Sequence, residues 1–495
     1  MLDAPSLIFA TLALGATTTA PAAPPSARGD DAALAVALEA VQPARLSADL
    51  RFLASDALRG RDTPSPELRV AALYLRNRVE RLGFTPGARD GWFHTYSLHR
   101  AHLDGAASSL ELSSSLGRER LEFGSDYFLQ LASHAFDSRL DAGVVCVGGG
   151  SEEEVAAAEL EGRWALLIDT GRMFKKAVRR CRAAGALGVV ATPGPDFDLE
   201  RRGTYDERYG ERARDMLAPG RPRLKPREPK GELPQVMLPR ATAQRLYALA
   251  PRRWEGEHPP AGHDLGLELR EERALAREQL DVENVCALWP GSDPTLAGEV
   301  MIVSAHFDHV GERRGEIFNG ADDNASGTTG LLALADALVA YGPLKRSVLL
   351  LWVSGEEKGL WGSQAWTEDP WLPDGARPVL DVNLDMIGRT EGDELYITPS
   401  REHDAFNSLA KAAYRLAPAE GFPELQSQDE YWRRSDHMNF NDNLEIPVVF
   451  LSTGDHEDYH QPSDTADKID YEKSSRIVRL VMRLLDDVQD TELRR

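Results

Sequence analysis

The feature that most constrains the fold is a repeated pair of segments, an apolar run of strand length followed by an amphipathic segment, which begins near Asn284. The strand-length runs are residues 300–305, 348–353, 379–384 and 446–451, and the segments with helical periodicity are 328–340 and 472–487. Parallel strands buried on both faces are apolar throughout and need helical crossovers. The pattern therefore predicts an α/β fold with a doubly wound, mostly parallel sheet covered by helices on both faces.

Candidate metal ligands follow these runs, where each strand is expected to end. They are His306 after the first run, Asp323 before the next helix, Glu356 and Glu357 after the second run, Asp385 after the third, and His460 in the loop after the fourth. Because ligand sites of doubly wound sheets lie beyond the carboxyl ends of the strands, we expect these side chains to converge. Burying carboxylates without counter-charges is costly, and no equal set of Lys or Arg accompanies them. Bound cations are therefore expected.

The ligand types indicate which metal would bind. Imidazole and carboxylate without thiolate suit zinc, cobalt or manganese. The three cysteines, Cys146, Cys181 and Cys286, are widely spaced and contain no Cys-x-x-Cys pair, so they are expected to be buried free thiols. One catalytic zinc takes three protein ligands and a water, whereas five candidate ligands with a central Asp suit two metals that share a carboxylate. The predicted cofactor is two zinc ions per chain.

The adjacent glutamates can divide two tasks between them. Glu357 is expected to bind metal, while Glu356 stays off the metal, takes a proton from the metal-bridging water and passes it to the leaving amine. Two neighbouring glutamates by themselves would rather indicate an exposed acidic turn. The other candidate ligands give this pair its catalytic interpretation.

Six blocks in this half of the chain resemble the family of co-catalytic zinc peptidases that includes aminopeptidase Y, aminopeptidase S and glutamate carboxypeptidase. The blocks, in family order, are 306–311 (HFDHVG), 320–327 (GADDNASG), 354–363 (SGEEKGLWGS), 383–388 (NLDMIG), 434–437 (RSDH) and 458–465 (DYHQPSDT). By position, the resemblance implies metal ligands at His306, Asp323, Glu357, Asp385 and His460, with Asp323 as the bridge. It also implies that Glu356 is the general base.

The same resemblance implies three supporting features. Asp308 would orient His306 through the second ring nitrogen of the imidazole. The peptide bond between Asp323 and Asn324 is one that is often cis in this family. A tyrosine shortly before the Ser-Asp-His block would stabilise the oxyanion, and Tyr431 is the residue chosen for this role.

A smaller α/β domain is expected within the peptidase domain. The segments 160–168 (LEGRWALLI) and 183–190 (AAGALGVV) resemble a protease-associated domain, which implies a lid or a substrate filter without catalytic residues. The predicted boundaries are 29–140 for the first part of the peptidase domain, 141–270 for the insertion and 271–495 for the catalytic part. Residues 200–232, rich in Arg, Pro, Gly and Glu, are expected to form a solvated loop.

Composition limits the partners and the compartment. A formal net charge of -22 excludes nucleic acid as a favoured partner. The apolar run 7–16 and the small residues after it predict a signal peptide and linker over residues 1–28, although no Lys or Arg precedes the run. The run is too short to span a membrane. We therefore expect a secreted or periplasmic protein whose partner is a peptide or protein substrate.

Two other hydrolase classes are weighed and set aside. The segment from His456 to His460 fits the His-Glu-x-x-His pattern of single-zinc proteases, which requires a helix. A helix is not expected there, because the segment follows a strand and Pro462 comes two residues after His460. A serine hydrolase is disfavoured, because the chain has no Gly-x-Ser-x-Gly elbow and Ser435 lies directly beside Asp436 and His437.

Three alternatives within the resembling family stay open. A carboxypeptidase would need convergent Arg side chains, for which Arg433 and Arg434 are the nearest candidates. A glutaminyl cyclase or a metal-free receptor-like protein is disfavoured by the retained ligand positions. The sequence thus favours a zinc exopeptidase, with an aminopeptidase as first choice and a carboxypeptidase as second.

Overall fold

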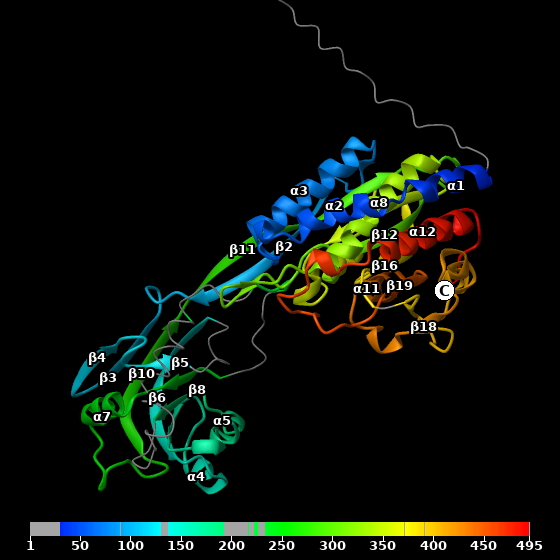
Figure 1. The fold of residues 1–495 in the computed structure, drawn as a ribbon. Coiled ribbons are helices and arrows are strands. Elements are labelled where there is room, and N and C mark those ends of the chain that lie inside the picture. Colours follow the sequence, from blue (N-terminus) through cyan, green and yellow to red (C-terminus); the bar gives the residue numbers. More distant parts are fainter. Residues whose placement is uncertain are drawn as a thin grey trace, which may run out of the picture. The chain divides into compact units, whose positions relative to one another are not determined.

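The computed structural model describes residues 30–89, 91–129, 137–192, 216, 222–225, 233–370, 372–390 and 392–494. The chain divides into two compact units, one formed by the residues up to Tyr96 together with Glu283–Arg495 and the other by Ser97–Val282 (Figure 1). The predicted signal peptide, 1–28, and most of the predicted loop, 200–232, lie outside the described residues. No helix in the described ranges is long and apolar enough to cross a membrane.

The first unit is built on one mixed sheet in the order β1-β11-β15-β12-β16-β19-β17-β18, with β2 also paired to β11. Its strands are β1 (Thr85–Pro86), β12 (Glu299–His306), β15 (Ser347–Val353), β16 (Arg377–Leu384), β17 (Leu395–Thr398), β18 (Leu425–Ser427) and β19 (Val448–Ser452), together with the part of β2 (Phe93–Leu103) up to Tyr96 and the part of β11 (Leu275–Trp289) from Glu283. The four central strands, β15, β12, β16 and β19, are parallel, and antiparallel strands join them on both sides. The predicted α/β class with a mostly parallel central sheet is confirmed.

Helices cover this sheet on both faces, which explains why its central strands are apolar throughout. Trp352 of β15 donates its indole N–H to the carbonyl oxygen of Thr328, in helix α8 (Gly327–Tyr341), at 3.0 Å. The alternate residues Leu351 and Val353 pack instead with Trp366, in α9 (Trp361–Glu368). Successive strand residues point to opposite faces, so α8 and α9 lie on opposite sides of β15.

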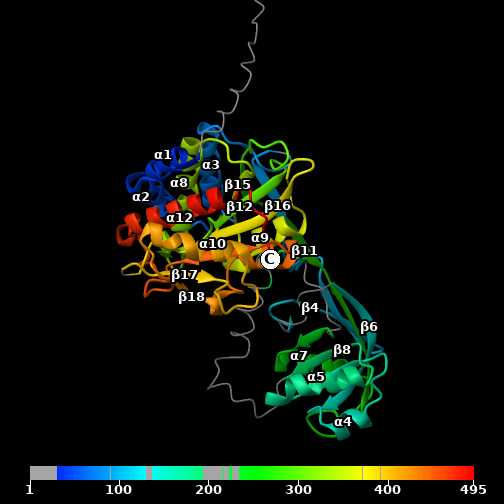
Figure 2. The same cartoon turned by 90° about the vertical axis from the view of Figure 1, so that its right-hand side faces the viewer.

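The remaining helices of the first unit complete the two layers seen in Figures 1 and 2. They are α1 (Asp30–Ala40), α2 (Pro43–Leu53), α3 (Pro66–Arg81), α10 (Ser408–Leu416), α11 (His437–Leu444) and α12 (Tyr471–Val488), and a short hairpin is formed by β13 (Glu312–Arg313) and β14 (Glu316–Ile317). Ser65 caps α3, because its hydroxyl accepts a hydrogen bond from the Leu68 amide at 3.0 Å. Phe440 of α11 packs in the same cluster as Trp366, so α11 covers the face that α9 covers.

The second unit has its own eight-stranded sheet in the order β4-β3-β10-β6-β7-β8-β9-β5. Its elements are β3 (Ser109–Ser114), β4 (Gly117–Leu121), β5 (Phe128–Leu129), β6 (Ser138–Gly148), α4 (Glu152–Ala157), β7 (Trp164–Ile168), α5 (Phe174–Ala183), β8 (Gly188–Thr192), β9 (Gln235–Met237), α7 (Arg240–Leu249) and β10 (Asp264–Arg273). Cys181 of α5 packs with Leu167 on one face of the sheet, and Leu246 of α7 packs with Trp164 on the other. This unit therefore has a core of its own.

The boundary of the second unit differs from the predicted one. Residues 97–140 were assigned to the first part of the peptidase domain, but they belong to the second unit. The reason is strand pairing, because β3 pairs with β10 and β10 pairs with β6. These are pairings between distant segments, which the local sequence does not reveal.

Candidate metal centre

The first group of candidate ligands forms where β12 ends. His306, the last residue of β12, places Nε2 3.1 Å from Asp385 Oδ1 and 3.4 Å from Asp323 Oδ1. Asp385 directly follows β16, and Asp323 lies in the connection between β12 and α8. All three side chains are buried or nearly so. One imidazole and two carboxylates around a common point match the three protein ligands of a catalytic zinc.

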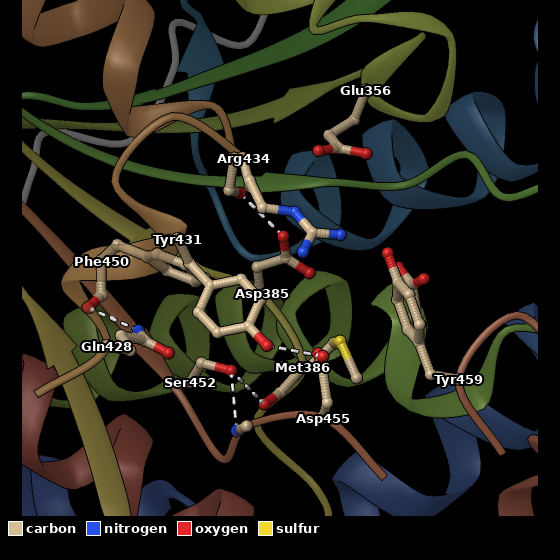
Figure 3. A pocket seen from close by; sticks show the side chains of 13 residues that line it. Glu356, Asp385, Met386, Gln428, Tyr431, Arg434, Phe450, Ser452, Asp455 and Tyr459 are labelled. Carbon is tan, nitrogen blue, oxygen red and sulfur yellow. Dashed lines mark hydrogen bonds between the residues drawn. The ribbon is translucent and has the colours of Figure 1, made fainter. Parts of the chain in front are cut away.

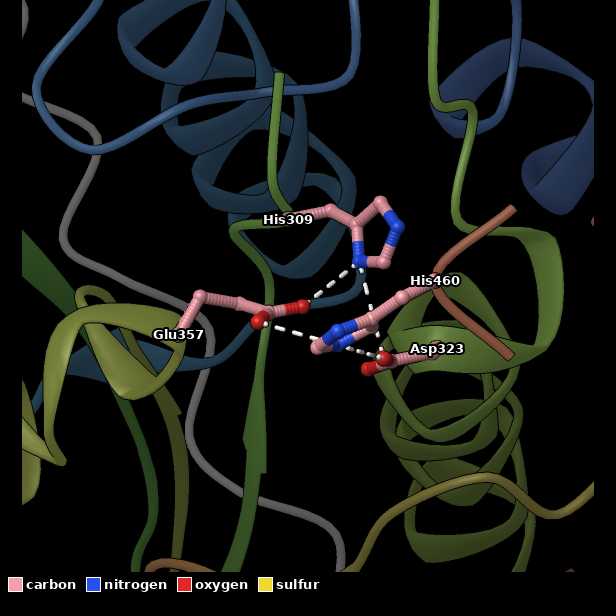
Figure 4. A group of neighbouring side chains, drawn as sticks. All are labelled: His309, Asp323, Glu357 and His460. Carbon is pink, nitrogen blue, oxygen red and sulfur yellow. Dashed lines mark ion pairs between the residues drawn. The ribbon is translucent and has the colours of Figure 1, made fainter. Parts of the chain in front are cut away.

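The second group lies beside the first and consists of His309, Asp323, Glu357 and His460 (Figure 4). His460 Nε2 lies 3.1 Å from Asp323 Oδ2 and 3.1 Å from Glu357 Oε2. His309 Nδ1 lies 2.7 Å from Glu357 Oε1 and 3.7 Å from Asp323 Oδ2. The structure thus brings together all five predicted ligands and adds His309, which the sequence analysis did not single out.

Asp323 belongs to both groups, with Oδ1 toward His306 and Oδ2 toward His460. Its peptide bond to Asn324 is cis, as the resemblance implied. The Asn324 side chain donates a hydrogen bond from Nδ2 to the Leu384 carbonyl oxygen at 2.9 Å, and its Oδ1 accepts one from the Met386 backbone amide at 3.2 Å. The Asn324 side chain therefore fixes the loop that carries Asp323 against the residues on either side of Asp385.

The electrostatics of both groups favour a bound cation. Burial lowers the pKa of His306, but the carboxylates of Asp385, Glu356, Asp308 and Asp323 together outweigh burial, and the net pKa lies well above the ordinary value. Burial also lowers the pKa of His460, whereas its contacts with Asp323 and Glu357 raise it to about 10. Both histidines are thus held as cations by the carboxylates around them. A bound metal would supply that positive charge instead.

Glu356 lies beside these groups, in the turn after β15, and lines a pocket on the first unit (Figure 3). Its pKa is raised well above the ordinary value. Burial is the main cause, the charge of His306 opposes it, and the carboxylates of Asp385 and Asp436 add to it. A carboxylate with a raised pKa next to a metal centre is suited to accept and release a proton.

Asp308 connects the first ligand group to Glu356. Its Oδ1 accepts a hydrogen bond from the Glu356 amide at 3.2 Å, and its Oδ2 accepts one from the Thr63 hydroxyl at 2.9 Å. His306 Nδ1 lies 3.2 Å from the Asp308 backbone oxygen and 3.6 Å from Asp308 Oδ1. Asp308 therefore contacts the ring that it was predicted to orient, chiefly through its backbone oxygen, and also holds the turn that carries Glu356.

Two tyrosines line the pocket. The hydroxyl of Tyr431, the residue predicted to stabilise an oxyanion, donates to Asp455 Oδ2 at 2.6 Å. Tyr459 was not singled out from the sequence, yet its hydroxyl faces the same space as the carboxylates of Glu356 and Asp385 (Figure 3). Its neighbour in the sequence is a predicted metal ligand, which is the signal that could have found it.

The residues present fit zinc. Both groups offer imidazole and carboxylate without thiolate, and the three cysteines are buried and free, as predicted. Glu357 Oε1 and both ring nitrogens of His309 have no hydrogen-bond partner in the described part of the chain. Buried polar atoms without partners are costly, and a metal ion between them would remove that cost.

The part of the chain that carries both ligand groups matches a known peptidase family. Residues 284–485 match the model of Peptidase family M28, and this range contains every residue of both ligand groups. This part of the chain belongs to peptidase family M28. The match covers all six blocks on which the resemblance was based.

Curated relatives match part of the chain. A probable leucine aminopeptidase from Arthroderma otae is 28% identical over 199 residues, which are 38% of this chain and 54% of the relative. Aminopeptidase YwaD from Bacillus subtilis is 28% identical over 193 residues, 37% of this chain and 40% of the relative. The chain thus spans about half the length of these relatives.

Solved structures of two aminopeptidases align with the chain at TM-scores below 0.5. An aminopeptidase from Aneurinibacillus sp. strain AM-1 is 21% identical, with 91% of this chain and 95% of that chain covered at a TM-score of 0.48. A zinc aminopeptidase from Bacillus subtilis is 19% identical, with 91% and 97% covered at a TM-score of 0.46.

Two motifs that could have indicated a single-zinc protease or a serine hydrolase have other roles in the structure. The segment from His456 to His460 is a loop and a turn, so its two histidines do not share a helix face. His456 Nε2 lies 3.3 Å from Asp322 Oδ2, away from both ligand groups. Ser435 donates to Asp385 Oδ2 at 2.7 Å and therefore holds a candidate ligand in place.

Proposed function

We propose that this chain is a zinc-dependent exopeptidase, and specifically an aminopeptidase, that binds two zinc ions. The observation that carries the proposal is the position of Asp323, whose two carboxylate oxygens each belong to a different ligand group. His306 and Asp385 would complete one zinc site, and Glu357 and His460 the other. A carboxylate shared by two metal sites is typical of two-metal hydrolases.

The chain's own residues can perform the remaining steps of hydrolysis. Zinc, when bound, supplies Lewis-acid chemistry that acidifies a water molecule and polarises a carbonyl group. Glu356 accepts the proton of the attacking water and later passes it to the leaving amine. A tyrosine hydroxyl donates to the developing oxyanion, and we assign this role to Tyr459 over Tyr431, because Tyr431 already donates to Asp455.

The charges of the pocket favour a substrate with a free amine. Its lining includes the carboxylates of Asp323, Glu356, Asp385 and Asp455. Arg434 is the one basic residue among the described residues that line it. A carboxypeptidase is the second candidate because of Arg434, but a single exposed arginine surrounded by carboxylates is a weak site for a substrate carboxylate.

Two further assignments complete the proposal. Residues 1–28 would be an export signal and linker, which would place the enzyme in the periplasm or outside the cell. The second unit would be a protease-associated domain, supported by the two segments that resemble one. Mass determination of the protein from cell fractions would test the first assignment, because removal of the signal shortens the chain.

Metal analysis and a substrate panel test the proposed function together. We expect about two zinc ions per purified chain by plasma mass spectrometry, and chelator-sensitive cleavage of peptides with a free amino terminus. Peptides blocked at the amino terminus should resist cleavage, and peptides blocked at the carboxyl terminus should not. The reverse pattern would establish the carboxypeptidase, pyroglutamate formation would establish the cyclase, and absence of zinc binding after zinc is added would refute an enzyme of this kind.

A further inference from the structure

The side chain of His309 is fully buried and points into the second ligand group (Figure 4). Its Nδ1 faces Glu357 Oε1 at 2.7 Å and Asp323 Oδ2 at 3.7 Å. Neither ring nitrogen has a hydrogen-bond partner among the described residues. An unpartnered imidazole nitrogen directed at two carboxylates is what a metal ligand looks like when its ion is removed.

The distances within the second group suit four ligands around one ion. Ligands of a tetrahedral zinc at about 2.0–2.1 Å lie about 3.3 Å from one another. His460 Nε2 lies 3.1 Å from Asp323 Oδ2 and 3.1 Å from Glu357 Oε2. His309 Nδ1 lies 3.7 Å from the same Asp323 oxygen and 2.7 Å from the other Glu357 oxygen, Oε1, so its two distances bracket the same value. The first group, by contrast, contains three residues.

The position of the His309 ring is set by residues outside the ligand group. A Cβ at Gly320 would lie 2.4 Å from His309 Cγ, so the ring packs against the bare backbone of Gly320. The His309 amide donates to the carbonyl oxygen of Arg61 at 3.2 Å, and Arg61 is itself buried. These contacts hold the imidazole where its Nδ1 faces the carboxylates.

We propose that His309 is a fourth protein ligand of the second zinc site, which makes the two sites unequal. The proposal rests on the proposed function, since it concerns the zinc that this function requires. The second site would have the closed ligand set of a structural zinc, formed by His309, Asp323, Glu357 and His460. The first site would keep an open position, with His306, Asp323 and Asp385. Zinc in the second site is therefore bound more tightly and exchanges more slowly.

X-ray absorption spectroscopy of zinc counts the imidazole ligands directly. The variant His306→Ala lacks the imidazole of the first site, so one equivalent of zinc added to this full-length variant reports on the second site. We expect two imidazole ligands per zinc from His309 and His460. One imidazole per zinc would overturn the proposal, because His460 would then be the only histidine that binds the ion.

Affinity measurements on the full chain provide a second readout. In the wild-type protein we expect one zinc to resist a chelator concentration that removes the other. His309→Ala should lower the affinity for the retained zinc by more than about 100-fold. Loss of a residue that only hydrogen-bonds to a metal ligand already lowers the metal affinity by about 10–100-fold. His94→Gln, which changes another buried histidine of the same unit, should leave both affinities unchanged.

The outcomes separate the two proposals. If the wild-type chain binds no zinc and cleaves no peptide, the proposed function fails. If it binds two zinc ions and cleaves peptides but His309→Ala retains both with unchanged affinity, only the role of His309 fails. Should His309→Ala not fold, the imidazole count on His306→Ala still decides the matter.

Discussion

The ring of Tyr459 stacks on the ring of His460, with centroids 4.0 Å apart and ring planes inclined by 21°. This contact ties the orientation of Tyr459 to a candidate metal ligand. Burial, together with the nearby carboxylates of Asp323 and Glu357, raises the pKa of the Tyr459 hydroxyl far above its ordinary value. A tyrosine hydroxyl with a raised pKa is protonated at neutral pH and can donate a hydrogen bond.

Tyr459→Phe should lower kcat by about 10²–10³-fold, the usual cost of removing one oxyanion donor, with zinc content unchanged. The matched variant Tyr431→Phe removes a hydroxyl of the same pocket that already donates to Asp455, so its effect on kcat should be less than about tenfold. Steady-state kinetics on a free-amine anilide compare the two. A larger loss in Tyr431→Phe would restore the original assignment of the oxyanion donor.

Glu356→Gln should lower kcat by about 10²–10⁴-fold, because the proton acceptor is lost. Both zinc ions should remain bound, because no metal ligand is changed. Glu357→Gln is the matched control, since it changes the adjacent glutamate in the same way. This second variant should lose zinc as well as activity. Kinetics and metal analysis on the two proteins test the division of labour, and full activity in Glu356→Gln would exclude Glu356 as the base.

Asp308→Ala should lower the affinity for zinc by about 10–100-fold, which is the usual effect of removing a residue that contacts and orients a metal ligand. It should also lower kcat at saturating zinc, because the Glu356 amide loses the carboxylate that it donates to. Thr63→Val removes the hydroxyl that donates to the same carboxylate and should give a smaller change in the same direction. Competition with a zinc-binding dye measures the affinity, and an unaltered affinity in Asp308→Ala would contradict this role.

Asp381→Asn should stabilise the protein at high pH. Burial raises the pKa of Asp381 well above its ordinary value, although the Ser304 hydroxyl donates to it at 2.8 Å. A folded-state pKa above the unfolded one means that the stability is fully present below the unfolded pKa of about 4 and is lost as pH rises toward the folded pKa. Asn cannot ionise, so the variant should melt at a higher temperature than wild type at pH 8 and at nearly the same temperature at pH 4. Equal melting temperatures at pH 8 would show that Asp381 ionises without cost.

The central strands could be predicted from the sequence because strands that are buried on both faces consist of consecutive apolar residues. A strand covered on both faces is apolar throughout, as in 348–353, where Trp352 packs on α8 and its neighbours pack toward α9. The antiparallel strands that join this sheet and the start of the second unit could not be predicted in the same way. Their places depend on pairing between distant segments, such as β3 with β10.

The sequence by itself determined the five predicted ligand positions and Glu356, because each follows or precedes a regular element at the end of the sheet where parallel strands terminate. Tertiary structure decided that His309 joins the second group, since the contacts of its ring with Gly320 and of its amide with Arg61 set its direction. It also decided that Tyr431 donates to Asp455 while Tyr459 faces Glu356. Strand ends follow from local periodicity, whereas the direction of a loop side chain depends on residues far away in the chain.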